Sequence, residues 1–320
     1  MKSSNIGGQA VLEGIMMRNG GQYAVAVRKP DNEIAVDVQE YKSVIPGNTV
    51  RKIPFIRGIF NFIDSLVLGV KTLMFSASFF EDEEEEAKVL TAGEKEKKEK
   101  QEQLLMNLTM AFSLVLAVGI FMLLPYFLSS LLRRYIRSRF FMTVVEGILR
   151  VLIFLGYLAL VSRMEDIQRT FMYHGAEHKC INCIEHGLEL NVENVRKSSK
   201  EHKRCGTSFL FFVMIVSIVF CFFITAESQV LRVLIRVLLM PVIAGVSYEI
   251  IRLAGNSDNS FVNLLSRPGL LVQNLTTKEP DDSMIEVAIR AVEAVFDWRA
   301  YLKENFGKEC SPDNVEEAHK

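Results

Sequence analysis

Two histidines and a glutamate lie within five consecutive residues in the segment "YHGAEHKC", in a chain of 320 residues with only five histidines. At about 100° per residue, His174 and His178 lie about 40° apart around a helix, and Glu177 lies about 60° to the other side of His174. Two imidazoles at i and i+4 can bind one divalent ion, and a carboxylate between them can activate a metal-bound water. The pattern H-x-x-E-H, the inverted zincin motif, predicts a divalent metal, preferably zinc, with Glu177 as general base.

The same segment also has a purely structural interpretation. Polar side chains commonly lie at the end of a membrane helix, and Tyr173 and Lys179 are residue types that anchor such ends at the interface. An anchor of this kind does not require two histidines at ligand spacing with a glutamate on the same face. Metal binding is therefore the preferred hypothesis.

Two histidines do not complete a metal site, so further ligands are expected elsewhere in the chain. His202 and Cys205 form an H-x-x-C pair directly before an apolar segment and are the preferred partners. Glu249 ranks close behind, because a distant glutamate supplies the third ligand in inverted zincins. Glu185 is on the same helix face but about 10 Å along the axis from His178, and it cannot share the ion unless the helix breaks.

Two nearby cysteines offer an alternative metal site. Cys180 and Cys183 form a C-x-x-C pair that could bind a structural zinc together with His202 and Cys205. On a continuous helix they point about 240° and 180° away from His174 and cannot share its ion. The two remaining histidines are expected to be exposed to solvent: His186 and His319.

The elements that would position these residues are mostly apolar helices. Hydrophobic residues make up 49% of the chain, and the segments Leu104 to Leu132 and Ser208 to Ala226 are almost unbroken apolar sequence. Each is close to or above the roughly 20 residues that a spanning helix needs. Phe140 to Ser162 and Val230 to Ala254 are also predicted to span. Their charged residues should face other helices: Glu146, Arg150, Arg232, Arg236 and Glu249.

An apolar helix predicted over residues 53–80 carries a narrow polar stripe at intervals of seven residues, formed by Arg57, Asp64, Lys71 and Ser78. This helix is expected to be amphipathic in the interface, to be re-entrant, or to span with its stripe inward. The predicted fold is an α-helical membrane protein with about four transmembrane helices, this additional helix, a small N-terminal β element and a cytoplasmic C-terminal helix.

The remaining segments flank the predicted membrane domain. Alternating residues from Tyr23 to Val38 predict two strands joined by a polar turn, within an N-terminal segment 1–52. Residues 81–103 form a charged linker, and residues 104–255 form the membrane domain, with the motif loop at 163–207. In the C-terminal soluble segment 256–320, Ser283 and Glu286 predict a capping box for a helix beginning near Met284.

Charge predicts the orientation and excludes one class of partner. Eight lysines and arginines lie between Arg163 and Arg204, against none at 227–229 and four at 133–139. The motif loop and the C-terminus are therefore expected to be cytoplasmic in a multi-pass protein of the inner (plasma) membrane. The net charge of −1 and the lack of a basic stripe exclude nucleic acid as a partner. No signal peptide is expected in Met1 to Lys52, and free thiols are expected in place of disulfides.

Six segments resemble the YqhQ-type bacterial membrane proteins, a family of unknown function described only as predicted metal-dependent enzymes. They cover the chain nearly end to end apart from the acidic linker: "IGGQAVLEGIMMR" (Ile6 to Arg18), "PFIRG" (Pro54 to Gly58), "YHGAEHK" (Tyr173 to Lys179), "RCGTSF" (Arg204 to Phe209), "SYEIIRLAG" (Ser247 to Gly255) and "LTTKEPDD" (Leu275 to Asp282). The resemblance implies no established reaction. It implies that Cys180 falls where the family has another residue, and it marks these as signature positions: His174, Glu177, His178, Cys205, Glu249 and the segment around Glu13.

The glycine-rich N-terminal string suggests a tight backbone path that could bring Glu13 and Arg18 to the site. It is not a dinucleotide-binding loop, because it lacks G-x-G-x-x-G. If this segment and the histidines share one site, both lie on one membrane face, and the helix over 53–80 does not simply span.

Three functions remain open at this level. The first is a metal-dependent hydrolase acting on a lipid-linked or peptide substrate at the cytoplasmic face of the lipid bilayer. The second is a non-enzymatic scaffold or sensor, in which His174, His178, His202 and Cys205 form a closed structural site. The third is a transporter that uses the charges in the second and fourth spans. A pair such as Glu146 and Arg150 at i,i+4 more simply neutralises itself.

Overall fold

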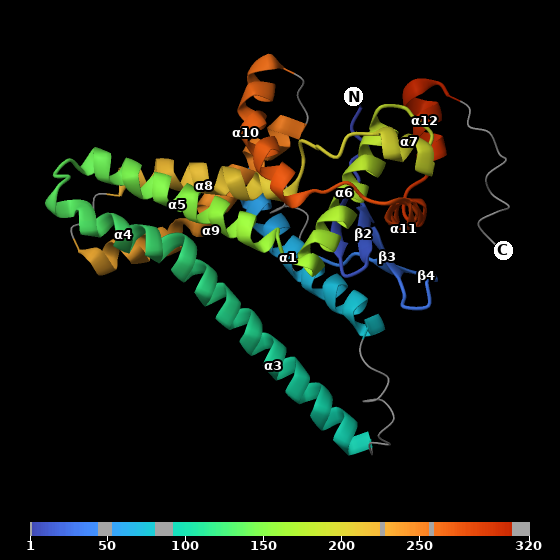
Figure 1. Cartoon of the computed structure of the whole chain (residues 1–320), viewed down its shortest axis with the longest axis horizontal. Helices are drawn as coiled ribbons and strands as arrows, with labels where there is room; N and C mark the ends of the chain where they lie inside the picture. The colour runs from blue at the N-terminus through green and yellow to red at the C-terminus, as the bar shows by residue number, and fades with distance from the viewer. Residues whose placement is uncertain (1, 44–52, 81–91, 225–227, 256–258, 309–320) are drawn as a thin grey trace. The chain divides into compact units, whose positions relative to one another are not determined.

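The computed structural model describes residues 2–43, 53–80, 92–224, 228–255 and 259–308 (Figure 1). The chain forms two compact units. Unit 1 contains Met1–Phe80, Leu160–Phe212 and Ala244–Lys320, and unit 2 contains Glu81–Ala159 and Val213–Ile243. Part of the predicted linker, residues 81–91, and the tail with His319 lie outside the described residues.

Unit 1 contains a four-stranded antiparallel sheet with the order β1-β2-β3-β4. The strands are β1 (Gly7–Val11), β2 (Gly14–Asn19), β3 (Gln22–Arg28) and β4 (Ile34–Glu40). The predicted N-terminal β element and its hairpin are confirmed as β3 and β4, whereas β1 and β2 were not predicted. The strands β1 and β2 were not predicted because each contains glycine, which lowers the strand signal in the sequence. At two of these glycines the neighbouring backbone is very close. A Cβ on Gly8 would lie 2.5 Å from the Met16 carbonyl oxygen, and one on Gly14 would lie 2.3 Å from that of Ala26.

Helices cover both faces of this sheet. On one face, α1 (Ile56–Ala77) packs through Leu68 against a cluster that includes Met16, Tyr23 and Val25. On the other face, α6 (Glu165–Glu185) and α11 (Asp282–Glu293) share a larger hydrophobic core with the sheet. The sheet is therefore the middle layer of unit 1. The shorter elements of this unit are η2 (Ser78–Phe80), α7 (Val192–Lys197), α10 (Ser260–Thr276) and α12 (Trp298–Phe306).

One prediction about a helix end is wrong, and another helix boundary has no signal in the sequence. The second predicted span does not continue as a helix to His174, because α5 (Arg139–Val161) ends and α6 begins only at Glu165, after Met164 in an extended conformation. No glycine or proline is needed for this break, and acidic residues in the first turn of α6 favour a new start there. The cap of α11 is Asp281, whose side chain accepts from the Met284 N–H, and the predicted box of Ser283 and Glu286 does not form.

Unit 2 consists of apolar helices. It contains α3 (Ala92–Val118), the π-helical η3 (Gly119–Leu123), α4 (Leu124–Leu131), η4 (Leu132–Arg134), most of α5, and parts of α8 (Gly206–Phe223) and α9 (Gln229–Gly255). The Glu146 carboxylate is buried and pairs with Arg150 on its own helix and with Arg236 on α9. This confirms the expectation that these charges face other helices. Their mutual pairing gives them a structural role without invoking transport.

Five described helices are long and apolar enough to cross a membrane. They cover Ile56–Phe80, Leu104–Leu131, Phe140–Val161, Gly206–Phe223 and Val230–Ala254. Four coincide with the predicted spans, and the fifth is the predicted amphipathic or re-entrant helix. The chain is thus a mostly helical membrane protein with a small N-terminal sheet.

Candidate metal centre

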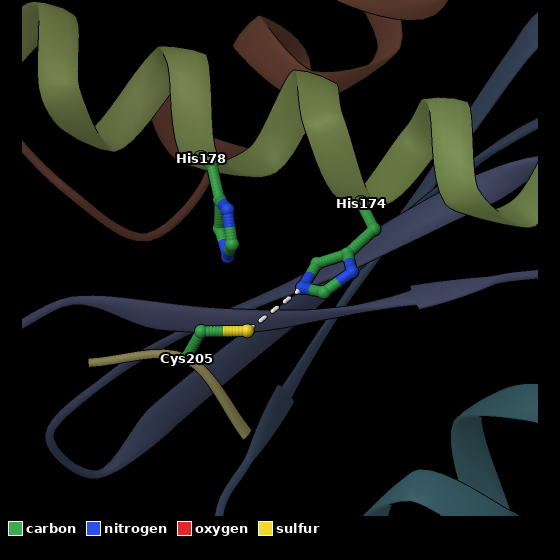
Figure 2. Close-up of side chains that lie close together, drawn as sticks. All are labelled: His174, His178 and Cys205. Atoms are coloured by element: carbon green, nitrogen blue, oxygen red, sulfur yellow. Dashed lines mark hydrogen bonds between the residues drawn. The ribbon is translucent and has the colours of Figure 1, made fainter. Parts of the chain in front are cut away.

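Three side chains with metal-binding atoms converge in unit 1. His174 and His178 project from the same side of α6 toward Cys205, which comes from a separate segment (Figure 2). One ligand atom from each of the three lies within 4.8 Å of the other two. The His174 Nε2 and the Cys205 Sγ are 3.3 Å apart. A tetrahedral zinc ion places a nitrogen and a sulfur ligand about 3.5 Å apart, so this pair is close to the spacing that a bound ion requires.

Hydrogen bonds connect the loop before Cys205 to α6, the helix that carries the histidines. The Lys179 ammonium donates to the carbonyl oxygens of Arg196 and Ser198, each at 2.9 Å. The Asn182 amide donates to those of Ser199 and Glu201, at 2.7 and 2.8 Å. One face of α6 therefore supplies two donor groups and positions the loop that supplies the third.

Backbone carbonyls orient both imidazoles. The Nδ1 of His174 is 2.9 Å from the Thr276 carbonyl oxygen, and the Nδ1 of His178 is 2.7 Å from that of Lys200. When Nδ1 donates to a carbonyl, Nε2 becomes the ring nitrogen available to a metal. Hydrogen bonds of this kind are the usual outer support of metal-binding histidines.

The electrostatics favour a thiolate at Cys205. Burial alone would raise the pKa of its thiol, but His174 and then His178 hold that pKa well below its usual range. Burial would likewise lower the pKa of His174, whereas Cys205 raises it to about 9. Cys205 directly precedes α8, and the Thr207 N–H lies 3.4 Å from its sulfur, which stabilises negative charge there. A divalent ion would replace the proton shared by this pair.

Glu177 lies beside the cluster, and only one of its two carboxylate oxygens accepts a hydrogen bond from a described residue. Its Oε1 accepts from the Gly8 N–H at 3.1 Å, while its Oε2 is buried and has no hydrogen-bond partner among the described residues. Burial raises the pKa of this carboxyl, and His174 and His178 oppose that rise. A buried carboxyl of raised pKa is suited to accept and return a proton near neutral pH.

These groups share one cavity of about 90 Å³, large enough for a few water molecules or a small reacting group. Its walls include Ile6, Gly7 and Gly8 from the N-terminal segment and Arg204 from the loop before α8. The N-terminal segment and the histidines therefore line one cavity, and the Gly8 N–H donates to Glu177. Glu13 and Arg18, which were the residues expected to reach the site from this segment, are not among the lining residues.

His202 lines the same cavity but its ring is directed to a different partner. Its Nε2 is 3.4 Å from Glu185, a fully buried carboxylate that also accepts from the Ser4 N–H and pairs with Arg204. Burial would raise the pKa of Glu185, but His202 and Arg204 lower it to about 2. Sequence reasoning excluded Glu185 as a ligand but missed this role. The available signal for this role was the position of Glu185 on the same helix face as His178.

The other candidate residues lie away from this cavity. Glu249, on α9, accepts from the Arg57 guanidinium and from the Phe55 N–H, so its carboxylate is held at the start of α1. Glu13 pairs with Arg169 on α6, about one turn before the histidines. Arg18 stacks over the ring of a tyrosine, with 3.4 Å between its guanidinium carbon and the ring centroid.

The two cysteines of the C-x-x-C pair belong to the hydrophobic core of unit 1. Cys180 is fully buried there, and the Cys183 thiol lies 3.3 Å from the Glu189 carbonyl oxygen. Because α6 continues past both, they point away from the histidines, as helical geometry predicted. The described cysteines, which include Cys205 and Cys221, are free thiols, and His186 is exposed.

Gly175 is essential to this packing, because a Cβ on it would lie 2.0 Å from the Lys278 carbonyl oxygen. The same segment supplies the Thr276 carbonyl that orients His174. We expect Gly175→Ala to destabilise the protein by about 1–3 kcal/mol, since backbone must shift to admit the methyl group. Thermal unfolding of the detergent-purified protein measures this. Gly156→Ala is the control, because its Cβ would meet no atom within 4 Å and should be tolerated. An equal effect of both substitutions would contradict the close approach.

Comparisons with known proteins identify the family of this chain. Residues 53–298 match the model of a family described as a protein of unknown function, DUF1385, and the chain belongs to that family. It is 36% identical over 300 residues to the uncharacterized protein YqhQ of Bacillus subtilis (strain 168), covering 93% of this chain and 94% of that protein. No solved structure matches the chain. The resemblance to the YqhQ-type family is confirmed.

Proposed function

We propose that this protein is a metal-dependent membrane hydrolase whose zinc ion is bound by His174, His178 and Cys205. One observation carries the proposal: three donor atoms converge within 4.8 Å beside a buried carboxylate oxygen that has no described partner. Catalytic zinc sites typically use three protein ligands and keep a fourth position for water. The neighbouring cavity offers room for that water and for the reacting group of a substrate.

The proposed roles follow from the chemistry of each group. His174, His178 and Cys205 would hold the metal, which would supply Lewis-acid activation of a water molecule. Glu177 would accept a proton from the attacking water as the water oxygen forms its bond to a carbonyl carbon of the substrate. Glu177 then returns the proton to the leaving group when the ester or amide bond breaks. The Gly8 N–H holds the other carboxylate oxygen and fixes the orientation of this base.

The substrate and location are also part of the proposal. Cys205 immediately precedes α8, one of the candidate spans, so the metal would lie at the edge of the membrane. This position suits a lipid-linked or peptide substrate that reaches the site from the bilayer surface. The excess of lysines and arginines in residues 163–204 favours a site and C-terminus on the cytoplasmic face of the inner membrane.

A structural metal site in a scaffold or sensor is the second candidate, and one observation favours it. His202 lines the cavity, and its ring centroid is 5.8 Å from that of His178. If the His202 ring left Glu185, it would offer a fourth protein ligand and close the site to water.

Metal analysis and spectroscopy of the detergent-purified protein test the proposal. We expect about one zinc ion per chain in the wild type and loss of that ion in His174→Ala and in Cys205→Ser. The Co²⁺-substituted protein should show a sulfur-to-metal charge-transfer band from the thiolate. Added acetohydroxamate, which needs an open coordination position, should change its visible spectrum.

The matched control is Glu193→Gln, because Glu193 is exposed on α7 and pairs only with Lys197 among the described residues. It should keep the metal at the wild-type level. Absence of zinc and other divalent ions from the wild type would refute the metal site. A metal that is retained but does not respond to acetohydroxamate would favour the structural alternative.

A further inference from the structure

The helix α1 has two faces of different character. One face contacts the sheet through polar groups: the buried Asp64 carboxylate accepts from the Tyr41 hydroxyl at 2.7 Å, and the Ser76 hydroxyl accepts from the Leu12 N–H at 3.1 Å. Lys71, between them, donates to the Gln39 side chain at 2.8 Å. The middle of the predicted polar stripe, Asp64 and Lys71, therefore meets the N-terminal sheet and the residue that follows it.

The opposite face of α1 is apolar, and its large side chains are exposed among the described residues of unit 1. Its side chains recur every three or four residues, which is the spacing of one helical stripe. They are between 37% and 54% exposed: Ile63, Leu66, Val67, Leu73 and Met74. Contiguous exposed apolar surface of this kind marks a site that binds another protein or a membrane. The sheet beside α1 and the path of the chain identify this partner independently of the metal site.

The sheet lies along much of the length of α1. The contacts from Asp64 to Ser76 extend along about 18 Å of helix axis. If α1 crossed the bilayer, the sheet beside it would lie at the depth of the hydrocarbon. The sheet ends in β4, which pairs with β3 on one side only, and β4 carries the exposed Glu40. Open sheet edges do not occur in contact with hydrocarbon, because their backbone groups would lack hydrogen-bond partners.

The path of the chain also restricts where α1 can lie. Two candidate spans, Leu104–Leu131 and Phe140–Val161, separate α1 from α6 and return the chain to the side from which it left. The sheet precedes α1, yet residues of the sheet such as Ile15 and Met17 share one hydrophobic core with α6 and α11. A crossing by α1 would place the sheet and α6 on opposite faces of the membrane. The shared core excludes this arrangement.

We infer that α1 binds the surface of the lipid bilayer, with its apolar stripe in the interface and its polar stripe on the sheet, and does not cross the membrane. The sheet, α6 and α12 then lie on one face, and the protein has four transmembrane helices. The stripe is a membrane-binding surface that holds unit 1 against the bilayer. Amphipathic helices bind bilayers in this way through the apolar area that they bury.

Depth-dependent quenching of tryptophan fluorescence tests this inference. The full-length Trp298→Phe protein would carry one new tryptophan, as Leu66→Trp or Leu73→Trp, in phosphatidylcholine vesicles brominated at shallow or deep acyl positions. These two positions are seven residues apart, about 10 Å along the axis. We expect shallow bromines to quench both tryptophans to a similar extent. Leu152→Trp, on the exposed face of α5, is the control for deep quenching.

Side-specific labelling provides the second measurement. Single cysteines at the exposed positions Glu33, Glu304 and Arg137 would be added to a Cys221→Ser, Cys310→Ser protein and labelled with a membrane-impermeant maleimide in intact cells and inverted vesicles. We expect positions 33 and 304 to react from the same side, and position 137 from the other. Reaction of 33 and 304 from opposite sides would overturn the inference. So would depths of the two α1 tryptophans that differ by about 10 Å, or no quenching of either.

Discussion

The Glu177→Gln protein is expected to keep its zinc ion and to lose activity by roughly 100-fold to 10,000-fold, the range that general acid–base catalysis contributes. Glutamine has the shape of glutamate, and its amide oxygen can still accept from the Gly8 N–H. It cannot accept a proton from water at neutral pH. The substitution therefore removes the chemistry of the base and leaves the geometry of the cavity.

The measurement combines metal content with complementation of a deletion strain whose growth depends on the protein. His178→Ala is expected to lose both the metal and the function, because it removes a ligand. Glu193→Gln, which changes an exposed carboxylate, should complement fully. Full complementation by Glu177→Gln would rule out its role as the base. Loss of metal from Glu177→Gln would instead assign the carboxylate a role in binding.

The Glu185→Ala protein is expected to be less stable by about 3 kcal/mol, because removing one partner of a buried ion pair leaves the other charge without compensation. Glu185 is fully buried, and its substitution leaves both His202 and the Arg204 guanidinium without their carboxylate. The thermal unfolding midpoint of the purified protein should fall by roughly 6–12 °C. Glu189→Ala, which changes a carboxylate outside this network, is the control.

The same carboxylate predicts a dependence of stability on pH. Its pKa is lowered from 4.5 to about 2 in the folded protein. The stabilisation is therefore fully present above pH 4.5 and is lost as the pH falls from 4.5 toward 2. The wild type should lose stability over this range more steeply than Glu185→Ala, which lacks the group. Parallel curves for the two proteins would show that Glu185 is not the group responsible.

The sequence predicted the part of the site that lies on one helix and left open the part that depends on tertiary structure. The face shared by His174, Glu177 and His178 follows from helical periodicity alone. Cys205 was one of three candidates for the next ligand, because the path of the loop depends on contacts such as those of Lys179, which periodicity does not reveal. Glu249 was another of these candidate ligands, yet its carboxylate pairs with Arg57 in the structure.

The fold was predictable to a similar degree. Long apolar helices are recognisable from composition, because few charges and about 20 residues suffice to identify them. The strands β1 and β2 were missed, because their glycines lower the strand signal while allowing close contacts with neighbouring backbone. The break between α5 and α6 has no glycine or proline to mark it.

The composition of unit 1 from three separate stretches of chain has a consequence for biosynthesis. The sheet is complete by Glu40, but α11, which covers it, begins only at Asp282. At 5–20 residues per second, the ribosome needs roughly 10–50 s to synthesise the residues between them. During this time the candidate membrane-spanning helices are synthesised, and the apolar face of the sheet stays without the cover of α11. The larger hydrophobic core of unit 1 is therefore completed late, and a chain that terminates before α11 would leave this face for chaperones or proteases to bind.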